Sequence, residues 1–353
     1  MAGGTGGHVF PALAVAKELM ARGVIVTWMG TQKGLESEVV PKAGIPIDWV
    51  TISGLRGNGF LGWLAAPFRL VRALMQARRI IVERNPGAVL GMGGFVTGPG
   101  GVAAWMLRKP LLVHEQNSIP GMTNRWLTNI ANKVMVAFPR AFEPNVKVIH
   151  TGNPLRQDIL QIPPPAVRFA GRSGPVRLLV IGGSLGAAAL NETVPAALQR
   201  FAPHARPAVW HQTGKRNLES AQAHYANAEV SANVVAFIDN MAEAYAWADL
   251  VICRAGALTI AELAAVGVGA ILVPYPHAVD DHQTTNAHYL TEAGAALLIQ
   301  QTDLTVSRLY DELMSLLNDR ERLLAVAQAA HKMALPAATL QVANICQEAA
   351  AHV

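Results

Sequence analysis

The chain has 353 residues, of which 51% are hydrophobic and only 15% are charged. This composition excludes a disordered or coiled-coil protein, and the length suffices for about two domains with buried cores. Residues 1–165 carry 17 basic and 8 acidic side chains (net +9), whereas residues 166–353 carry 12 and 16 (net −4), so the basic half predicts an anionic partner. The two cysteines, Cys253 and Cys346, are too few for a disulfide framework or a self-contained zinc site.

Short apolar runs alternate with helix-length amphipathic stretches along the whole chain. The predicted strands are 24–29, 88–92, 111–114, 133–137 and 146–149 in the first half, and 176–182, 208–211, 233–237, 250–253 and 270–274 in the second. The predicted helices include 9–22, 68–83, 192–200, 258–266 and 307–318. Apolar strands separated by helices are typical of parallel sheets covered on both faces, so the predicted fold class is α/β.

The alternation is interrupted between residues 153 and 176. Ile162-Pro-Pro-Pro165 and Gly171-Arg-Ser-Gly174 lie there, and a new apolar strand follows. This break predicts one domain at 1–155 and a second at 166–334. We expect two parallel sheets that face each other across a cleft, with ligands bound at the carboxyl ends of their strands.

Three glycine-rich loops follow predicted strand positions: Gly3-Gly-Thr-Gly-Gly7, residues 91–101 and Gly182-Gly-Ser-Leu-Gly186. Glycines let backbone N–H groups approach a ligand, and helix N-termini favour negative charge, so the loops predict a diphosphate site. The alternative is that they are tight packing turns. The first loop matches neither G-x-G-x-x-G nor the Walker lysine pattern, and no acidic residue closes strand 24–29, which disfavours a NAD site.

Polar side chains stand beside these loops. His8, in the first turn of a helix, is a candidate general base or else a packing histidine. The motif His114-Glu-Gln-Asn117 ends a strand, and Arg156 borders the domain break, where it would reach a phosphate across the cleft or remain a solvated surface residue.

The most specific pattern is the segment from Cys253 to Glu262. A strand ends, a glycine turn follows, and a helix opens near Leu258, so the first helical N–H groups and the Thr259 hydroxyl would take a phosphate. Glu262, one turn further, would accept two hydrogen bonds from ribose hydroxyls, or else act only as a favourable first-turn acid. Downstream, the amides of Gln283 and Asn286 suit sugar hydroxyls. The chain has no D-x-D pair and no Cys/His metal spacing, so we expect no metal site.

The segment from Gly54 to Asn85 interleaves bulky apolar residues with arginines and holds a single acid, Glu83. This pattern predicts an interfacial anchor for an anionic membrane surface, the alternative being a core helix with a basic solvated face. A nucleic-acid partner is disfavoured because the aromatic residues are clustered rather than spaced for base stacking.

Taken together, these motifs resemble the peptidoglycan N-acetylglucosaminyltransferases of the MurG type over essentially the whole chain. The motifs that carry the resemblance are Gly3-Gly-Thr-Gly-Gly-His8, Gly91-Met-Gly-Gly-Phe95, His114-Glu-Gln-Asn117, Gly152-Asn-Pro154, Gly182-Gly-Ser-Leu-Gly186 and Arg254-Ala-Gly-Ala-Leu-Thr259. The resemblance implies a GT-B fold of two Rossmann-like domains, with a last helix, about 335–353, that packs back onto the first. It also implies an inverting, cofactor-free transfer of N-acetylglucosamine from UDP-GlcNAc to lipid I, giving lipid II, by a peripheral enzyme on the cytoplasmic face of the bacterial inner membrane.

The resemblance further implies a set of site residues. UDP-GlcNAc would be held by Thr5, Gly6, Gly7, Asn117, Arg156, Ser184, Ile238, Ala257, Leu258, Thr259, Ile260, Ala261, Glu262 and Gln283. Within this set, the Ile238 backbone would meet the uracil and Glu262 the ribose. The acceptor diphosphate would lie at Gly4, Gly93 and Gly94, and His8 is the candidate base.

Two rival functions remain at this point, namely a GT-B-like UDP-N-acetylglucosamine 2-epimerase and a non-catalytic module that binds sugar nucleotides or membranes. One departure from the family is that only Met1 and Ala2 precede the first glycine loop, where its members carry a short apolar strand. We therefore expect the first sheet to lack a central strand, and the natural product to begin upstream.

Overall fold

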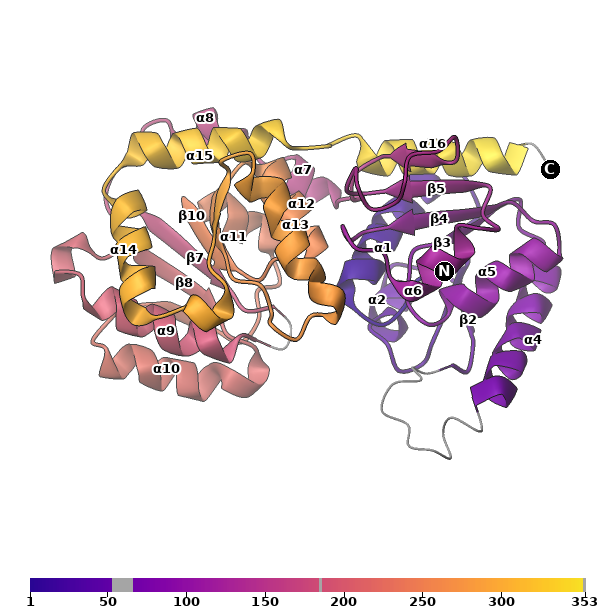
Figure 1. Cartoon of the computed structure of the whole chain (residues 1–353), viewed down its shortest axis with the longest axis horizontal. Helices are drawn as coiled ribbons and strands as arrows, with labels where there is room; N and C mark the ends of the chain where they lie inside the picture. Colours follow the sequence, from indigo (N-terminus) through magenta and orange to yellow (C-terminus); the bar gives the residue numbers. More distant parts are fainter. Residues whose placement is uncertain (53–65, 184–185, 352–353) are drawn as a thin grey trace. The chain divides into compact units, whose positions relative to one another are not determined.

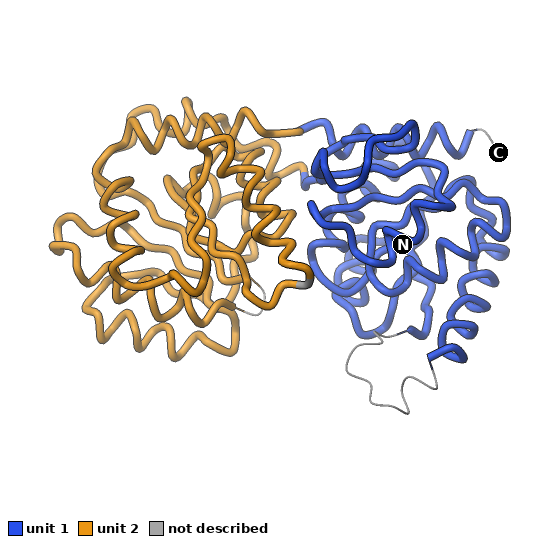
Figure 2. Tube along the Cα trace, in the orientation of Figure 1, with its two compact units in different colours: residues 1–156, 336–353 blue, residues 157–335 orange. Residues whose placement is uncertain are grey.

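The computed structural model describes residues 1–52, 66–183 and 186–351 (Figure 1). The chain divides into two compact units, which we call unit 1 (Met1–Arg156 with Pro336–Val353) and unit 2 (Gln157–Leu335) (Figure 2). Every strand pair in both units is parallel, and helices separate the strands along the chain. The predicted α/β class is therefore confirmed.

Unit 1 contains six described strands in two sheets. The strands are β1 (Trp28–Gly30), β2 (Ile47–Trp49), β3 (Val89–Gly91), β4 (Leu111–Glu115), β5 (Lys133–Val136) and β6 (Val148–His150). Its described helices are α1 (Gly6–Ala21), α2 (Glu36–Lys42), α4 (Ala66–Arg84), α5 (Thr97–Met106), α6 (Met122–Leu127) and α16 (Ala338–Ala351). Strands β3-β4-β5-β6 form one sheet, and β1-β2 form another. Helix α16 packs on α1, where the Arg22 guanidinium donates to Asn344 (2.6 Å) and Gln347 (2.7 Å).

The first two residues lie where a strand between β1 and β3 would end. The Met1 amino group donates to the Leu90 carbonyl oxygen (2.7 Å), and the Met92 N–H donates to the Met1 carbonyl oxygen (2.9 Å), which is the pattern of a parallel ladder. On the other side, the Trp28 indole N–H donates to the Ala2 carbonyl oxygen (2.9 Å). In the described part of unit 1 the first sheet is thus broken at its centre.

The break also explains an error in the sequence prediction. Strand 24–29 was expected, but the backbone pairs only from Trp28, because no described strand flanks the residues before it on the β3 side. Ile25, expected inside this strand, is 93% exposed. An apolar β-pattern forms a ladder only where partner backbones are present.

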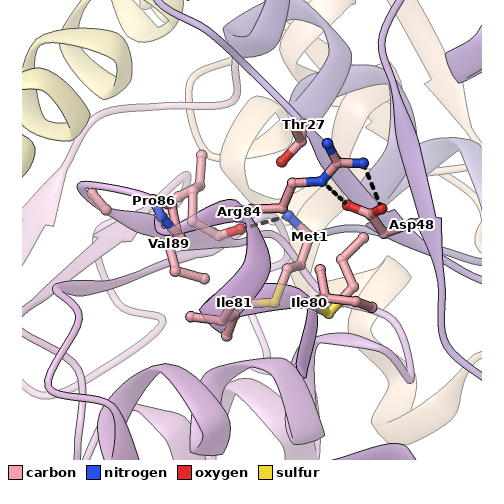
Figure 3. Close-up of a pocket in the computed structure, with 11 residues that line it drawn as sticks. Met1, Thr27, Asp48, Ile80, Ile81, Arg84, Pro86 and Val89 are labelled. Carbon is pink, nitrogen blue, oxygen red and sulfur yellow. Dashed lines mark hydrogen bonds and ion pairs between the residues drawn. The ribbon is translucent and has the colours of Figure 1, made fainter. Parts of the chain in front are cut away.

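A pocket lies beside Met1 (Figure 3). Residues of α4, β2 and β3 line it, and Arg84 donates two hydrogen bonds to Asp48 at its wall (3.0 and 2.8 Å). Burial lowers the pKa of the Met1 amino group to about 5, because the charged ammonium is poorly solvated there.

Adding about five apolar, β-branched residues before Met1 is expected to raise the Tm of unit 1 by about 5–10 °C. The added segment would pair with the edges of β1 and β3 and would remove the buried amino group. Differential scanning fluorimetry measures the change, with a Gly/Ser extension of the same length as the control. An equal Tm for both extensions would show that the break costs no stability.

Unit 2 contains a single six-stranded parallel sheet. Its strands are β7 (Arg177–Ile181), β8 (Ala208–Gln212), β9 (Asn233–Val235), β10 (Leu250–Cys253), β11 (Gly269–Leu272) and β12 (Ala296–Leu298). Its helices are α7 (Gln157–Leu160), α8 (Pro165–Phe169), α9 (Ala188–Gln199), α10 (Leu218–Asn227), α11 (Met241–Trp247), α12 (Ala257–Val266), α13 (His282–Thr291), α14 (Val306–Leu317) and α15 (Arg320–Lys332). A large cluster of buried apolar side chains from the strands, α9 and α14 forms its core.

The strand order β12-β11-β10-β7-β8-β9 is that of a doubly wound sheet. The chain leaves the sheet centre in one direction from β7 through β9 and in the other from β10 through β12. The order therefore reverses between β7 and β10. In such sheets ligands bind in the crevice outside the carboxyl ends of the two strands at the reversal.

The prediction of a second glycine loop over residues 91–101 is partly wrong. Helix α5 begins at Thr97, so Gly98, Gly100 and Gly101 belong to a helix. A Cβ atom on Gly101 would lie 2.7 Å from a Leu127 methyl group, so this glycine lets α5 pack closely on α6. Close helix packing is thus the physical reason for Gly101, whereas Gly93 and Gly94 remain in a loop.

Candidate functional site

The first two glycine loops of unit 1 lie against each other. Gly93 and Gly94 have φ of +95° and +86°, which disfavour any residue with a Cβ atom. A Cβ atom on Gly94 would collide with the Gly3 carbonyl, and one on Gly93 would lie 2.6 Å from the His8 ring. The contact between loops thus explains these two glycines, and it fixes His8, in the first turn of α1, beside the second loop. We call residues 3–8 with Gly93 and Gly94 the glycine cluster.

A buried carboxylate that the sequence prediction missed holds the glycine cluster in place. Glu36, fully buried at the start of α2, accepts hydrogen bonds from the Gly4 N–H (2.9 Å), the Thr31 N–H (3.0 Å) and the Thr31 hydroxyl (2.6 Å). Burial alone would raise the pKa of Glu36, but these hydrogen bonds outweigh it and hold the pKa below its ordinary value. The Gly4 amide is therefore engaged with Glu36 in this structure.

The His114–Asn117 motif builds a loop at the carboxyl end of β4. Glu115 is buried and accepts from the Asn117 N–H (2.9 Å), the Gly121 N–H (3.1 Å) and the Asn124 amide (2.8 Å). Burial lowers the pKa of His114 to about 4, so this histidine is neutral near pH 7. Of the four motif residues only Asn117 is partly exposed, and its side chain is also in contact with Glu115 (3.3 Å).

Arg156 lies beside the start of α1, and the preceding turn at residues 152–153 contacts the loop after β4. The Arg156 guanidinium lies over the Phe10 ring of α1, 6.0 Å from its centroid, and a Cβ atom on Gly6 would lie 3.0 Å from that ring. The Asn153 amide donates to the Gln116 carbonyl oxygen (3.1 Å). Unit 1 therefore gathers the glycine cluster and Arg156 near the start of α1, and it ties the Asn117 loop to the residues that precede Arg156.

In unit 2 the candidate donor residues surround the reversal point of the sheet. The loop after β7 contains Gly182 and Gly183, and the turn after β10 leads into α12 with Gly256 as its N-cap. No acidic residue lies in the first turn of α12, so the positive end of the helix dipole is not neutralised there. Ser184 lies outside the described residues. The Ile260 side chain is fully buried, which leaves its backbone as the only part able to meet a ligand.

Gln212, which the sequence prediction missed, connects two loops at this edge. Its side-chain oxygen accepts from the Gly183 N–H (3.1 Å), and its side-chain nitrogen donates to the carbonyl oxygens of Gly183 (3.0 Å) and Ala236 (3.1 Å). One buried side chain at the end of β8 thus holds the glycine loop together with the segment that leads to Ile238.

Glu262 lies on the second turn of α12 and is 9% exposed. Its Oε2 atom accepts a hydrogen bond from the Tyr245 hydroxyl of α11 (3.0 Å). Burial, together with the nearby Glu262 charge, raises the pKa of the Cys253 thiol to about 12, so this thiol stays protonated and is no nucleophile. The carboxylate of Glu262 therefore lies near the carboxyl end of β10.

The two downstream amides differ in their surroundings. Gln283, partly exposed, accepts from the Tyr275 N–H through its side-chain oxygen (3.0 Å). Asn286 is fully buried and donates to the Ala255 carbonyl oxygen (3.3 Å), so it supports the turn before α12. Because its side chain is buried, it is not placed to meet a sugar hydroxyl directly, contrary to the sequence prediction.

A third feature is the outer face of α4, which we call the α4 surface. The helix buries Ala73, Ala77 and Ile81 and packs on α5. Its opposite face exposes large apolar side chains at helical spacing: Phe68, Val71, Met75 and Val82. Arginines 69, 72, 78 and 79 are exposed on the same helix. The part of the predicted anchor before Ala66 lies outside the described residues.

Among the described residues, no three His, Cys, Asp or Glu side chains gather in a way that would hold a metal ion. Among the same residues, no helix combines the length and apolar character that a membrane-spanning segment needs.

Both units match known family models. Residues 1–136 match the glycosyltransferase family 28 N-terminal domain, and residues 177–342 match the glycosyltransferase family 28 C-terminal domain. A protein of Nitrosococcus oceani, named UDP-N-acetylglucosamine--N-acetylmuramyl-(pentapeptide) pyrophosphoryl-undecaprenol N-acetylglucosamine transferase, is 55% identical over 350 residues, which cover 99% of this chain and 98% of the relative.

Solved structures agree with these matches. The crystal structure of Acinetobacter baumannii MurG is 43% identical, with a TM-score of 0.85 over 99% of this chain and 98% of that one. A putative UDP-N-acetylglucosamine 2-epimerase from Listeria monocytogenes has a TM-score of 0.67 over 96% of this chain and 92% of that one, but it is only 15% identical. At 15% identity, the similarity to the epimerase shows a common fold and nothing more.

Proposed function

The chain belongs to glycosyltransferase family 28, with relatives of the MurG type, and from this premise we propose that it converts lipid I to lipid II. It is a hexosyltransferase of the GT-B fold that moves N-acetylglucosamine from UDP-GlcNAc to the C4 hydroxyl of the muramoyl sugar in undecaprenyl-diphospho-MurNAc-pentapeptide. The observation that carries the proposal is 55% identity to a transferase of this name over 99% of the chain.

Unit 2 is the proposed donor domain. The amides of residues 257–261 and the Thr259 hydroxyl take the UDP diphosphate, supported by the acid-free first turn of α12. Glu262 accepts from the ribose hydroxyls, the Ile238 backbone meets the uracil, and Gln283 and Ser184 contact the sugar nucleotide. The support for this placement is that all these residues except Ser184 lie in described loops or helices that follow the carboxyl ends of parallel strands.

Unit 1 is the proposed acceptor domain. Gly93 and Gly94 take the acceptor diphosphate, while the Gly4 amide supports the first loop through its bond to Glu36. Thr5, Gly6, Gly7, Asn117 and Arg156 contribute further donor contacts. His8 is the candidate base, supported by its place in the first turn of α1 beside Gly93.

The proposed reaction is a direct displacement that inverts the anomeric centre. The muramoyl C4 oxygen forms a bond to C1 of N-acetylglucosamine as the bond from C1 to the UDP oxygen breaks, and UDP leaves with that electron pair. The hydroxyl proton passes to the base, for which His8 is the candidate. Backbone amides and helix N-termini stabilise the departing diphosphate, so the proposed mechanism requires neither a metal ion nor another cofactor.

Incubation with UDP-GlcNAc alone separates this function from the rival epimerase. We expect no UDP-N-acetylmannosamine by chromatography, and UDP release only after a short-chain lipid I analogue is added. Formation of UDP-N-acetylmannosamine without acceptor would favour the epimerase. The 15% identity to such a protein does not favour that function. UDP binding without any turnover in the presence of the acceptor would favour a non-catalytic module.

We place the enzyme on the cytoplasmic face of the inner membrane as a peripheral protein, bound to anionic lipid through the segment from Gly54 to Asn85. The α4 surface supports this proposal, because apolar side chains flanked by arginines suit an anionic lipid interface. Exposed tryptophans on the neighbouring helices, Trp105 of α5 and Trp126 of α6, add apolar area in the same unit. Nucleic acid is not a proposed partner.

Replacing Phe68 and Met75, which are 80% and 65% exposed, by aspartate is expected to weaken binding to phosphatidylglycerol vesicles at least about 10-fold, because their apolar area no longer enters the bilayer. Vesicle co-sedimentation measures the loss. Val167→Asp in α8 of unit 2, with 61% exposure, is the matched control and should bind as the unaltered protein does. Equal binding by all three proteins would rule out the α4 surface as the anchor.

A further inference from the structure

Tyr245 and Glu262 form a buried pair on two helices of unit 2. The Tyr245 hydroxyl donates to Glu262 Oε2 at 3.0 Å, and Tyr245 is 1% exposed. Helices α11 and α12 pack together, so the two backbones that carry the pair are held in place. The motifs of the sequence do not include Tyr245.

A glutamate recognises a ribose only when its carboxylate is oriented toward both hydroxyls. A glutamate side chain has several rotatable bonds, and fixing them costs conformational entropy on each binding event. A tyrosine hydroxyl that already holds one oxygen reduces that cost, because the carboxylate is oriented before the nucleotide arrives. The bonded oxygen can still accept another hydrogen bond, since a carboxylate has about four acceptor positions.

We propose that Tyr245 is a positioning residue that orients the Glu262 carboxylate and thereby sets the preference of the donor site for a ribonucleotide over its 2′-deoxy counterpart. The inference rests on the proposed donor role of Glu262. It adds a specificity-determining residue on α11 that contacts the nucleotide only through another side chain.

The test is binding of UDP and dUDP to the full chain by isothermal titration calorimetry, without acceptor. The unaltered protein should prefer UDP, and Tyr245→Phe should reduce this preference about 5- to 10-fold. In transfer assays the same variant should raise the KM for UDP-GlcNAc by a similar factor and leave kcat within about 2-fold. Tyr245→Met is a second variant of similar volume, in case the first is poorly folded.

Two further variants separate positioning from a general loss of packing. Tyr225→Phe also removes a buried hydroxyl in unit 2, one bonded to His211 Nδ1 (2.8 Å), and it should leave the UDP/dUDP preference unchanged. In a Glu262→Ala background, Tyr245→Phe should have no additional effect on the preference, because the residue on which it acts is gone.

An unchanged UDP/dUDP preference in Tyr245→Phe would overturn the inference. The inference would also fail if Tyr245→Phe reduced the preference by the same factor in the Glu262→Ala background as in the unaltered protein. A protein that shows these preferences yet transfers no sugar would support the inference while overturning the proposed reaction. A protein that does not distinguish UDP from dUDP would overturn the ribose role of Glu262 and the inference together.

Discussion

Glu262→Ala is expected to raise the KM for UDP-GlcNAc at least about 100-fold, with a much smaller change in kcat. The substitution removes two hydrogen bonds from ribose hydroxyls to a charged acceptor, each worth about 1.5–3 kcal/mol, and these bonds are made equally in the ground and transition states. Initial rates over a range of donor concentrations at saturating acceptor measure the effect.

Two controls qualify this result. Glu219→Ala removes an exposed glutamate from α10 of the same unit and should leave the KM unchanged. Glu262→Gln keeps an acceptor for the Tyr245 hydroxyl, so it should preserve the melting temperature, whereas Glu262→Ala leaves that buried hydroxyl without this partner at a cost of about 1–3 kcal/mol. Donor kinetics equal to those of the unaltered protein in Glu262→Ala would remove the residue from the ribose site.

Gly94→Ala is expected to reduce transfer at least about 100-fold, with a much smaller loss of UDP binding. The added Cβ atom would collide with the Gly3 backbone, so the two loops of the glycine cluster must separate, and a displacement of about 1 Å at a reacting centre costs about that factor. Because the collision lies in unit 1, the nucleotide contacts in unit 2 should not change. Transfer assays and calorimetry with UDP measure the two quantities on the same protein.

Gly23→Ala is the matched control for backbone strain. Gly23 has a φ of +78°, similar to the +86° of Gly94, but a Cβ atom there meets nothing within 4 Å. In both variants an alanine in the left-handed backbone region lowers the free energy of unfolding by about 1 kcal/mol. Only Gly94→Ala adds a collision. Similar transfer rates in the two variants would show that loop contact in the glycine cluster is not needed for the reaction.

The sequence predicted the fold class because the central strands are continuous apolar runs. Strand β10 was predicted at its observed bounds, 250–253, since it lies between β7 and β11 and all four of its residues are buried. Strands β2 and β12, each of only three residues, were missed.

The supporting residues of the site could not be found from the sequence. Glu36 bonds to Gly4 across 32 residues, Gln212 to Gly183 across 29, and Tyr245 to Glu262 from a separate helix. Each is an isolated polar residue in an ordinary context, and its role depends on which backbone the fold brings beside it. Motifs that place glycines or polar groups directly after a strand were visible, because a parallel sheet brings strand ends to a common edge.

The broken first sheet was expected from the sequence and is observed among the described residues of unit 1. Met1 and Ala2 lie between β1 and β3, and among the described residues these two strands belong to separate sheets. The Gly91–Gly101 prediction failed for a different reason. Glycines that permit close packing of α5 on α6 have the same one-letter pattern as glycines that expose backbone amides.

The most direct test of the central claim is the transfer of labelled N-acetylglucosamine from UDP-GlcNAc to a short-chain lipid I analogue, with the product linkage determined by NMR. The account predicts label in the lipid product, joined by a β-1,4 bond to the muramoyl sugar, with one UDP released for each bond formed. Absence of lipid-bound label while UDP still binds, or an α linkage, would contradict it.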